Sequence, residues 1–453
     1  MTTYYISPFG NNNNNGLSTI LPFKTISKGL SLAIAGDIVY MLDGTWNESI
    51  SFPTSGTSSS LITLSAYPGT SPIIDGISKT GTSITINNKS YISVVGLTIT
   101  NYNTGISILG TCNNILIQKN ILHDLSYQGI FINSEYNTLT DITIDNNEFY
   151  QINGNPPGVW QVEIGCINPI FMKNSTIKNN NFHDSTSGGI IAQWSNGNTI
   201  NNNVFNNTNR CISFYGANHN NLDDSNNNII SYNTIINAKD RGIRFDYYTI
   251  GNQIIGNHII KVGLENHESG SKTYGINLYP GTRNALIKDN YLEEAGTVAS
   301  GLVNTNFENN IFNANGISAL GLGNGDQGYV NNVGISFINN IFINPAGNMD
   351  FLYTDNFIMK NNIMYGASVK LVSPVNSSII KYNDFYNSSL IGQTLDITNI
   401  QSDPLFVDFI NKDYHLLPNS PCIGTGEGGV DMGAYSIPLI CPIPICNITI
   451  TQV

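Results

Sequence analysis

Short runs of alternating apolar and polar residues fill most of the chain, and an asparagine recurs at a constant place among them. The repeated unit is an aliphatic residue, two further positions, asparagine, one position, and an aliphatic or aromatic residue. Between residues 61 and 390 the asparagines of this unit are Asn120, Asn147, Asn180, Asn203, Asn233, Asn257, Asn290, Asn310, Asn340, Asn361 and Asn383. Neighbouring asparagines are 20 to 33 residues apart, a separation that is typical of a solenoid repeat.

A second signal lies between many of these units, a glycine followed by an alternating strand, at Gly105, Gly129, Gly189, Gly242, Gly275 and Gly301. Two or three short strands per repeat, without a long helical pattern, predict a coil of parallel strands. Each coil buries its apolar face only by stacking on its neighbours. The sequence therefore predicts an all-β protein, a single-stranded parallel β-helix over residues 61–400. We expect an inward asparagine at one corner of each coil to hydrogen-bond to the asparagine of the next coil.

The two ends of the chain depart from this repeat. Residues 1–60 predict an N-terminal cap made of a strand at Tyr4–Ser7, an amphipathic helix over Phe23–Ala35 and a strand at Ile38–Leu42. We expect residues 401–437 to close the solenoid, and residues 438–453 to form an apolar tail. This tail is either a flexible end or a contact with a partner chain in a homo-oligomer or larger assembly. A bridge between Cys441 and Cys446 within it stays open.

Both ends, together with the spacing of the asparagines, resemble a known family. The opening YYISPFGNNNNNGLSTILPFKTISKGLSLAIAGDIVYMLDGTW and the closing stretch Asp403–Tyr435 are similar to the ends of bacterial and viral members of the pectate-lyase-like superfamily. The resemblance covers about residues 3–436 and implies a right-handed parallel β-helix with an N-terminal helical cap. It leaves the activity open, because that superfamily contains lyases, glycosidases, epimerases, tailspikes and inert scaffolds.

The net charge of the chain indicates which classes of binding partner it suits. The net charge is −12 at pH 7 and only 11% of the residues are charged, without the basic patch that nucleic-acid binding requires. No apolar stretch is long enough to cross a bilayer, and residue 1 leads directly into strand-like sequence without a signal peptide. We expect a protein that acts outside the cell or on the surface of a virion, after loss of a leader or release by another route.

Charge is concentrated near the middle of the chain, where all four arginines lie between residues 210 and 283. The segment 237–248 contains Lys239, Asp240, Arg241, Arg244 and Asp246. Strand alternation turns Ile243 inward and Arg244 outward. On neighbouring coils the same register places four further side chains on this outer face: Gln193, Tyr215, Asn277 and Tyr279. Tyrosine suits sugar rings and arginine suits a carboxylate, so we predict that this face binds an acidic polysaccharide or surface glycan.

One interpretation of this face is a polysaccharide lyase. β-Elimination beside a uronate needs the carboxylate to be neutralised and a base to take the C5 proton. The resemblance implies a lysine or arginine as that base, and the candidates are Lys239, Arg241 and Arg244. It also implies Ca²⁺ held by clustered aspartates, and the candidate ligands are Asp223, Asp224, Asp240 and Asp246.

Two other interpretations stay open. A glycoside hydrolase would use two carboxylates, either Asp240 with Asp246 or Asp223 with Asp224. A non-catalytic surface or virion fibre protein would bind a glycan or only support other parts. In that case Arg241–Asp240 and Arg244–Asp246 are exposed ion pairs without a chemical role.

Overall fold

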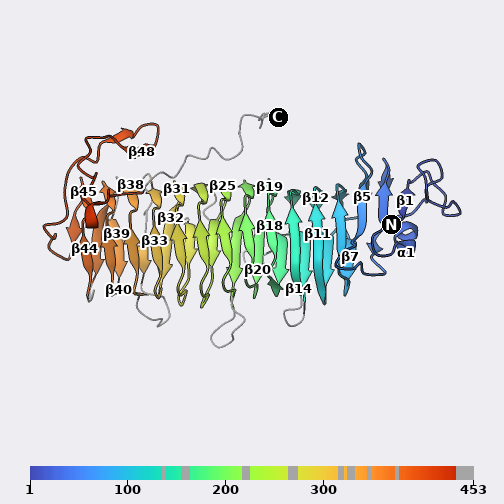
Figure 1. The fold of residues 1–453 in the computed structure, drawn as a ribbon, viewed down its shortest axis with the longest axis horizontal. Helices are drawn as coiled ribbons and strands as arrows, with labels where there is room; N and C mark the ends of the chain where they lie inside the picture. The colour runs from blue at the N-terminus through green and yellow to red at the C-terminus, as the bar shows by residue number, and fades with distance from the viewer. Residues whose placement is uncertain are drawn as a thin grey trace.

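The computed structural model describes residues 1–134, 139–154, 164–216, 225–263, 274–314, 321–323, 332–343, 348–352, 354–372 and 377–434. Three long parallel sheets run the length of a rod, with the N-terminal coils at one end and the C-terminal segment at the other (Figure 1). From β2 onward most successive strands belong to different sheets, so a typical turn of the chain adds one strand to each sheet. The predicted fold class is therefore confirmed: the chain is an all-β parallel β-helix.

The first sheet, sheet A, consists in spatial order of β1 Thr3–Ile6, β2 Ile38–Met41, β5 Ile62–Ala66, β8 Ile92–Val95, β11 Cys112–Gln118, β14 Leu139–Asp145, β18 Thr176–Lys178, β21 Thr199–Asn201, β24 Ile229–Ser231, β27 Gln253–Ile255, β30 Leu286–Lys288, β33 Asn306–Glu308, β37 Ser336–Ile338, β41 Ile358–Lys360 and β44 Ile379–Lys381. The short strand β17 Met172–Lys173 also pairs with β14.

The second sheet, sheet B, consists of β3 Thr45–Trp46, β6 Ile73–Asp75, β9 Thr98–Thr100, β12 Ile121–Leu125, β15 Glu148–Ile152, β19 Asn181–His183, β22 Val204–Asn206, β25 Thr234–Ala238, β28 His258–Val262, β31 Tyr291–Glu293, β34 Ile311–Asn313, β38 Ile341–Ile343, β42 Ile363–Tyr365 and β45 Asp384–Tyr386.

The third sheet, sheet C, consists of β4 Ile50–Ser51, β7 Thr82–Asn87, β10 Thr104–Leu109, β13 Gln128–Asn133, β16 Gly165–Ile170, β20 Gly188–Gln193, β23 Arg210–Tyr215, β26 Arg241–Phe245, β29 Tyr274–Leu278, β32 Gly296–Ser300, β35 Gly321–Gly323, β39 Asn348–Leu352, β43 Ser368–Val372 and β46 Leu390–Ile391. The remaining elements are β36 Asn332–Val333 with β40 Thr354–Asp355, β47 Phe406–Asp408 with β48 Asp413–Leu416, helix α1 Ile26–Leu32 and the 3₁₀ turn η1 Glu427–Gly429.

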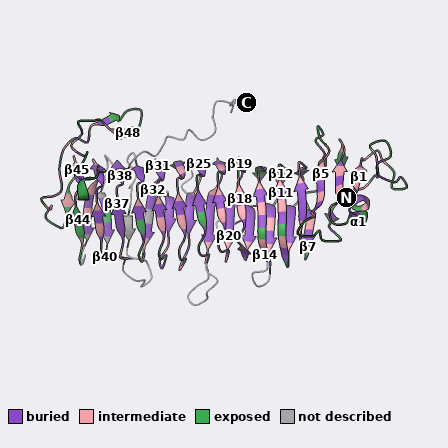
Figure 2. Cartoon of the chain, in the orientation of Figure 1, coloured by how far each residue is buried: buried purple, intermediate pink, exposed green. Residues whose placement is uncertain are grey.

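The core is a column of like residues stacked from coil to coil. Phe149, Phe182 and Phe205 are fully buried, with successive ring centres 4.8 and 4.6 Å apart. Buried and more exposed residues alternate in the second half of β11 and β14, whereas β10, β16 and β20 of sheet C are buried at all but their last position (Figure 2). Because parallel strands lie about 4.8 Å apart, equivalent side chains of adjacent coils meet at stacking distance. The repeat of apolar residues is therefore satisfied by contact with the same type of residue above and below.

A continuous series of hydrogen-bonded asparagines occupies the corner between sheets A and B. In each step the side-chain oxygen of one asparagine accepts both the backbone N–H and the side-chain N–H of the previous one, at 2.8–3.0 Å. The members are Asn120, Asn147, Asn180, Asn203, Asn233, Asn257, Asn290, Asn310, Asn340, Asn362, Asn383 and Asn399. These side chains satisfy backbone groups that would otherwise be buried without partners.

The sequence prediction for one member of this series is wrong by one residue. Asn362, not Asn361, hydrogen-bonds to Asn340 and Asn383. Asn361 has a φ of 58°, the left-handed conformation that the chain also adopts just before several other asparagines of the series. The shift follows from the inward residues of this coil, because Met359 and Met364 fill the core in place of the isoleucines that the repeat suggested.

Helix α1 lies at the N-terminal end of the rod and is shorter than the predicted helix (Figure 1). The side chain of Thr25 accepts a hydrogen bond from the Lys28 amide and so begins the helix. Phe23 is outside it, since this residue forms a bridge with Ile6. Ile26 and Leu30 are buried, and the helix contacts β1, β2 and β4.

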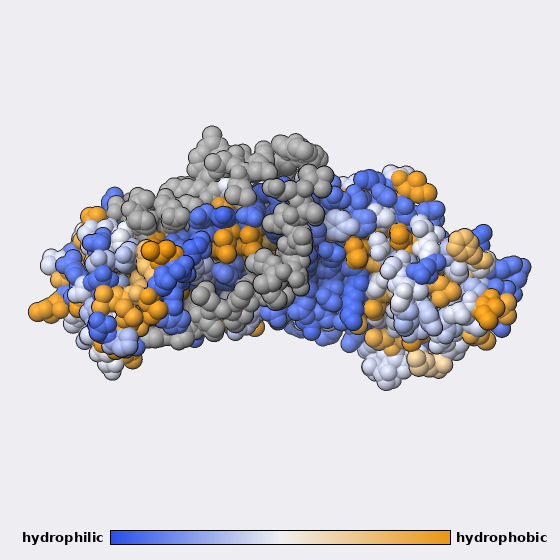
Figure 3. Space-filling model, turned by 90° about the horizontal axis from the view of Figure 1, so that it is seen from above, coloured by the Kyte–Doolittle hydropathy of each residue, from blue (hydrophilic) through white to orange (hydrophobic). Residues whose placement is uncertain are grey.

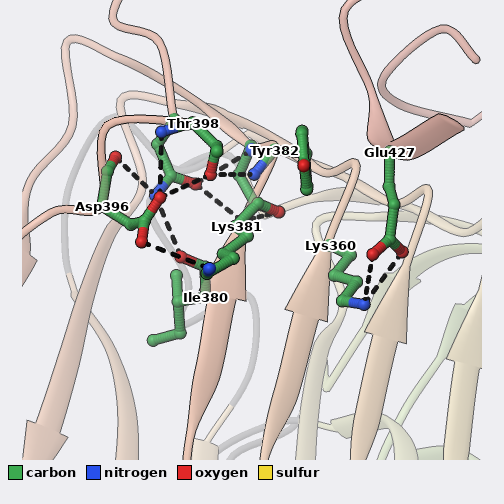
Figure 4. A network of polar contacts seen from close by, with 9 residues as sticks. Lys360, Ile380, Lys381, Tyr382, Asp396, Thr398 and Glu427 are labelled. Atoms are coloured by element: carbon green, nitrogen blue, oxygen red, sulfur yellow. Dashed lines mark hydrogen bonds and ion pairs between the residues drawn. The ribbon is translucent and has the colours of Figure 1, made fainter. Parts of the chain in front are cut away.

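The segment after β46 turns back onto the outer face of sheet B. Phe406, Tyr414, Cys422 and Met432 pack against outward residues of four sheet B strands, namely Tyr291, Ile311, Ile341, Ile343 and Ile363. Polar contacts fix the segment at both ends. Lys360 Nζ lies 2.7 Å from Glu427 Oε1, and Thr398 donates to Asp396 and accepts the Tyr382 amide (Figure 4). Lys412 also binds Glu293.

Large exposed apolar side chains belong mainly to the two ends of the rod, among them Phe9, Ile20, Ile397 and Ile410. Figure 3 shows apolar patches near both ends and a hydrophilic stretch between them. Among the described residues, no helix has the length and apolar character needed to span a membrane.

We predict that Asn233→Ala removes at least roughly 3 kcal/mol from the free energy of unfolding, because it leaves buried N–H groups of Asn203 without an acceptor. Asn233 also donates to Ile200 O and Asn257 Oδ1, and both bonds disappear. Denaturant titration measures the loss. The control Asn13→Ala changes an exposed asparagine and should cost less than about 0.5 kcal/mol. Equal effects of the two changes would contradict a structural role of the buried series.

A second prediction concerns Asp384, whose carboxylate is fully buried and accepts from the Ser402 amide and the Cys422 thiol. Burial raises the pKa of Asp384 to about 6, although these two hydrogen bonds oppose the change. A raised pKa means that ionisation destabilises the fold, so stability falls as pH rises from about 4 to 6 and then levels off.

We expect Asp384→Asn to remove this decline and to raise stability at pH 7 to 8 by about 2 to 3 kcal/mol, measured by denaturant titration across pH. Asp403→Asn, a change to an exposed carboxylate of the same segment, should keep most of the pH dependence. Loss of stability in Asp384→Asn at pH 8 would show that the negative charge itself holds the segment.

Candidate functional site

The candidate site lies on the outer face of sheet C, across strands β20, β23, β26 and β29. Ile190, Ile212, Ile243 and Ile276 are paired in register and buried in the core. The next residue of each strand faces outward, so that Ile191, Ser213, Arg244 and Asn277 form one row. Gly242 lies two residues before Arg244. It must be glycine, because a Cβ at this position would lie 2.4 Å from the Gly275 carbonyl oxygen.

Arg244 is the centre of this face. Its guanidinium carbon lies 4.6 Å from the ring centre of Tyr215 and 4.4 Å from that of Tyr279, so that two tyrosines of adjacent coils flank it. Its NH1 group donates to the Tyr215 hydroxyl at 3.0 Å, and its NH2 group to Asp246 Oδ1 at 3.2 Å. Arg244 is 8% exposed and Asp246 is 9% exposed. The expected ion pair exists, but it is buried rather than on an open surface.

Two further arginines extend this cluster. Arg210 and Arg241 pair with each other across β23 and β26, and both contact Asp240. Arg210 Nε lies 2.6 Å from Asp240 Oδ2, and its NH1 group is 3.4 Å from the Tyr215 hydroxyl. Arg241 NH1 donates to the Tyr279 hydroxyl at 3.3 Å. Each tyrosine hydroxyl of the site is thus bonded to at least one arginine.

The outer face also contains polar side chains close to Arg244. Ser213 and Asn277 pair with it on either side and are buried, although they point away from the core. Gln193 of β20 pairs with Tyr215 of β23, the next strand of the sheet. Four predicted binding residues, Gln193, Tyr215, Asn277 and Tyr279, therefore lie on one face with Arg241 and Arg244.

Comparison with known proteins gives the family. A family model described as "Pel9A-like, right handed beta helix region" matches residues 4–254. The chain belongs to this family. The resemblance inferred from the repeat and the two ends is thereby confirmed, and the solenoid of this Pel9A-like protein is right-handed.

A curated relative of this Pel9A-like protein has no assigned activity. The uncharacterized protein YwoF of Bacillus subtilis (strain 168) is 27% identical over 183 residues, which cover 34% of this chain. The match spans only 39% of the length of that relative.

Solved structures share the fold at low identity. A structure named glycoside hydrolase has a TM-score of 0.52 and 10% identity, covering 68% of this chain and 96% of its own. The periplasmic alginate epimerase AlgG has a TM-score of 0.50 and 14% identity, covering 79% and 78%. Pectate lyase Pel9A has a TM-score of 0.38 and 14% identity over 96% of each chain. At these identities the likeness shows the fold alone.

The described acidic residues do not by themselves form a Ca²⁺ site. Asp240 and Asp246 are each bonded to arginine, which already neutralises their charge. Within the described ranges no three His, Cys, Asp or Glu side chains are grouped as metal ligands. The other two predicted ligands, Asp223 and Asp224, lie outside the described residues.

Lys239 is placed away from the row that contains Arg244. It follows β25 at the bend before β26, where its amide donates to Thr208 O. Burial raises the pKa of Asp184 but is outweighed by hydrogen bonds from Asn207 and His183 and by the charge of Lys239, so that this pKa is below its ordinary value. Lys239 therefore lies close enough to Asp184 for their charges to interact.

Sequence reasoning did not select Arg210 as a site residue, although it noted the arginine. The strand that begins at Arg210 has Cys211 where the other strands have glycine, so the repeat signal is weaker there. Its partner Arg241 occupies the same place one coil later. This shared position is the signal that could have identified Arg210.

We predict that Arg244→Ala lowers the free energy of unfolding by about 3 kcal/mol, because it leaves the Asp246 carboxylate buried beside fewer donors. Denaturant titration measures the change, and adding Asp246→Asn should recover part of it. Arg283→Ala removes an exposed arginine and should cost less than about 1 kcal/mol. If Arg244→Ala is as mild as Arg283→Ala, the pair contributes no more than an exposed ion pair.

Proposed function

We propose that this protein binds an acidic polysaccharide on the outer face of strands β20 to β29 and cleaves it by β-elimination. The observation that carries the proposal is the cluster of Arg210, Arg241 and Arg244 with two tyrosine hydroxyls on one face of the solenoid. We also place the protein where such polymers occur, outside the cell or on a particle surface.

Charge favours an anionic ligand at this face. The chain as a whole has a net charge of −12, so an anionic polymer is repelled by most of its surface. Among the described residues of the cluster, by contrast, three arginines are paired with two aspartates, Asp240 and Asp246. An arginine presents its donors in a plane that matches a carboxylate, and tyrosine rings offer faces for sugar rings.

The arginines fit the first requirement of β-elimination. The proton on the carbon beside a carboxylate becomes acidic only if the negative charge that develops on that carboxylate is stabilised. An arginine stays protonated at any working pH, so Arg241 and Arg244 suit charge stabilisation better than proton abstraction. We therefore assign them to binding the uronate carboxylate and leave the base to another residue.

The names of related proteins fit a polymeric carbohydrate as the ligand. The family description refers to Pel9A, which is a pectate lyase, and the neighbour with a TM-score of 0.50 is an alginate epimerase. Hydrolysis by Asp240 and Asp246 fits less well, because both carboxylates are bonded to arginine. A Ca²⁺ ion stays part of the proposal only if Asp223 and Asp224 supply its ligands.

The unsaturated uronate formed by β-elimination absorbs ultraviolet light. We expect this absorbance to rise when the protein is incubated with one polymer of a panel of pectate, alginate and glycosaminoglycans. Arg244→Lys, which keeps a charge but not the paired donors, should lower kcat/KM by about 10²-fold or more. Arg283→Lys is the matched control and should leave kcat/KM unchanged. A flat trace with every polymer, together with measurable binding, would identify a non-catalytic glycan-binding protein instead.

The same assay tests the metal. If Ca²⁺ takes part, EDTA abolishes the rise in absorbance and added Ca²⁺ restores it. Activity and melting temperature that are both unchanged in EDTA would remove Ca²⁺ from the proposal.

A further inference from the structure

We propose that Tyr215 is the proton-transferring residue of this site, with its phenol oxygen as the base that removes the substrate proton. The inference rests on the proposed β-elimination and assigns the role that the arginines leave open. It comes from the contacts of one oxygen atom on the outer face of β23.

Two arginines of different strands donate to this oxygen. Arg244 NH1 lies 3.0 Å from the Tyr215 hydroxyl and Arg210 NH1 lies 3.4 Å from it. Hydrogen bonds from cationic donors stabilise an oxygen in its negatively charged form. The anionic phenolate is the form that accepts a proton, so the arrangement favours Tyr215 as a base. The ring is half-buried on the outer face, where a bound polymer can reach it.

Tyr279 provides an internal comparison. Its ring also flanks Arg244, at 4.4 Å, and its hydroxyl accepts from Arg241 at 3.3 Å. The ring centre of Tyr247 lies 5.1 Å away in an edge-on contact. For Tyr279 the described contacts include one arginine donor, against two for Tyr215. Tyr279 therefore suits the binding of a sugar ring.

Other described groups are less suited to act as the base. Asp240 and Asp246 are bonded to arginines, which stabilise the deprotonated form of both carboxylates. Lys239 lies at the bend before β26 and interacts with Asp184. The described histidines belong to sheet B or β48, namely His123, His183, His258 and His415. What distinguishes the Tyr215 hydroxyl among these described groups is that it accepts from two arginines, one of them the proposed carboxylate-binding Arg244.

The step balances without a further reactant. The Tyr215 phenolate takes the proton from C5 of the uronate, and the C5–H electron pair forms the C4–C5 double bond. The bond between C4 and the glycosidic oxygen breaks, and this oxygen leaves with its electron pair. The new phenol proton then passes to the leaving oxygen, which restores the phenolate. The products are one chain with an unsaturated end and one chain with a free hydroxyl.

The test compares Tyr215→Phe with Tyr232→Phe, a change to an exposed tyrosine between β24 and β25, on the polymer that wild-type protein cleaves. Loss of a proton-transfer group should lower kcat of Tyr215→Phe by about 10²- to 10⁴-fold, while polymer binding stays within about threefold of wild type. Tyr232→Phe lies outside the candidate site and should leave kcat unchanged. Circular dichroism and melting temperature establish that both variants are folded.

Replacement of Tyr215 by a fluorinated tyrosine gives a second test that keeps the hydroxyl. Fluorine makes the phenol more acidic, so the acid limb of the pH–rate profile should move to lower pH, whereas the same replacement at the exposed Tyr232 should leave the profile unchanged. A Tyr215→Phe protein that keeps kcat within tenfold, or a profile that does not move, overturns the role of Tyr215 and leaves the proposed elimination standing. Absence of elimination by wild-type protein on the whole panel overturns the proposed function, and the role of Tyr215 with it.

Discussion

Stacking in register is the constraint on which the rest of this structure depends. A single coil cannot bury its apolar face, and its corner contains buried backbone groups that need hydrogen-bond partners. Stacking of like side chains buries the apolar faces, and the buried asparagines satisfy the backbone groups, as Asn233 does by bonding to Asn257 and to the Ile200 carbonyl. Insertion or loss of a residue within a coil is tolerated only in the loops between strands, where register is not disturbed. This explains why the spacing of the asparagines varies while their contacts do not.

The same constraint builds the candidate site. Parallel strands in register bring side chains from different repeats together on the outer face, about one strand spacing apart. Arg244 therefore lies between Tyr215 and Tyr279 without any tight turn or long loop to position it. Its contact with Asp246 holds the guanidinium in one orientation, and such preorganisation lowers the entropy cost of the polysaccharide binding that we propose. Strand register thus brings Arg210, Arg241 and Arg244 together on one face of an acidic protein.

The residues whose positions were predicted wrongly show what local sequence patterns did not determine. The repeat permitted either Asn361 or Asn362 at the corner, since each has an apolar residue three positions before it and another two positions after it. The choice depends on which residues fill the core, and Ile363 is available for the outer face only because the C-terminal segment covers it. Helix α1 is also shorter than its apolar spacing suggests, because Phe23 pairs with Ile6 instead of continuing the helix. In each case a contact with a distant part of the chain decided a local alternative.

The sequence by itself determined the solenoid, most of the buried asparagine series and the outward direction of Arg244 and Asp246. These follow from the period of the repeat and from alternation along a strand, which are local properties. Only the tertiary structure decided that the pair is buried, that Arg210 joins it, and that two arginines meet at the hydroxyl of Tyr215. The bends between coils and the rotamers of long side chains decide these contacts, because an arginine can reach several neighbours from one position. The strand register determines the row of the sheet in which a side chain lies, whereas packing determines which neighbouring side chain it contacts.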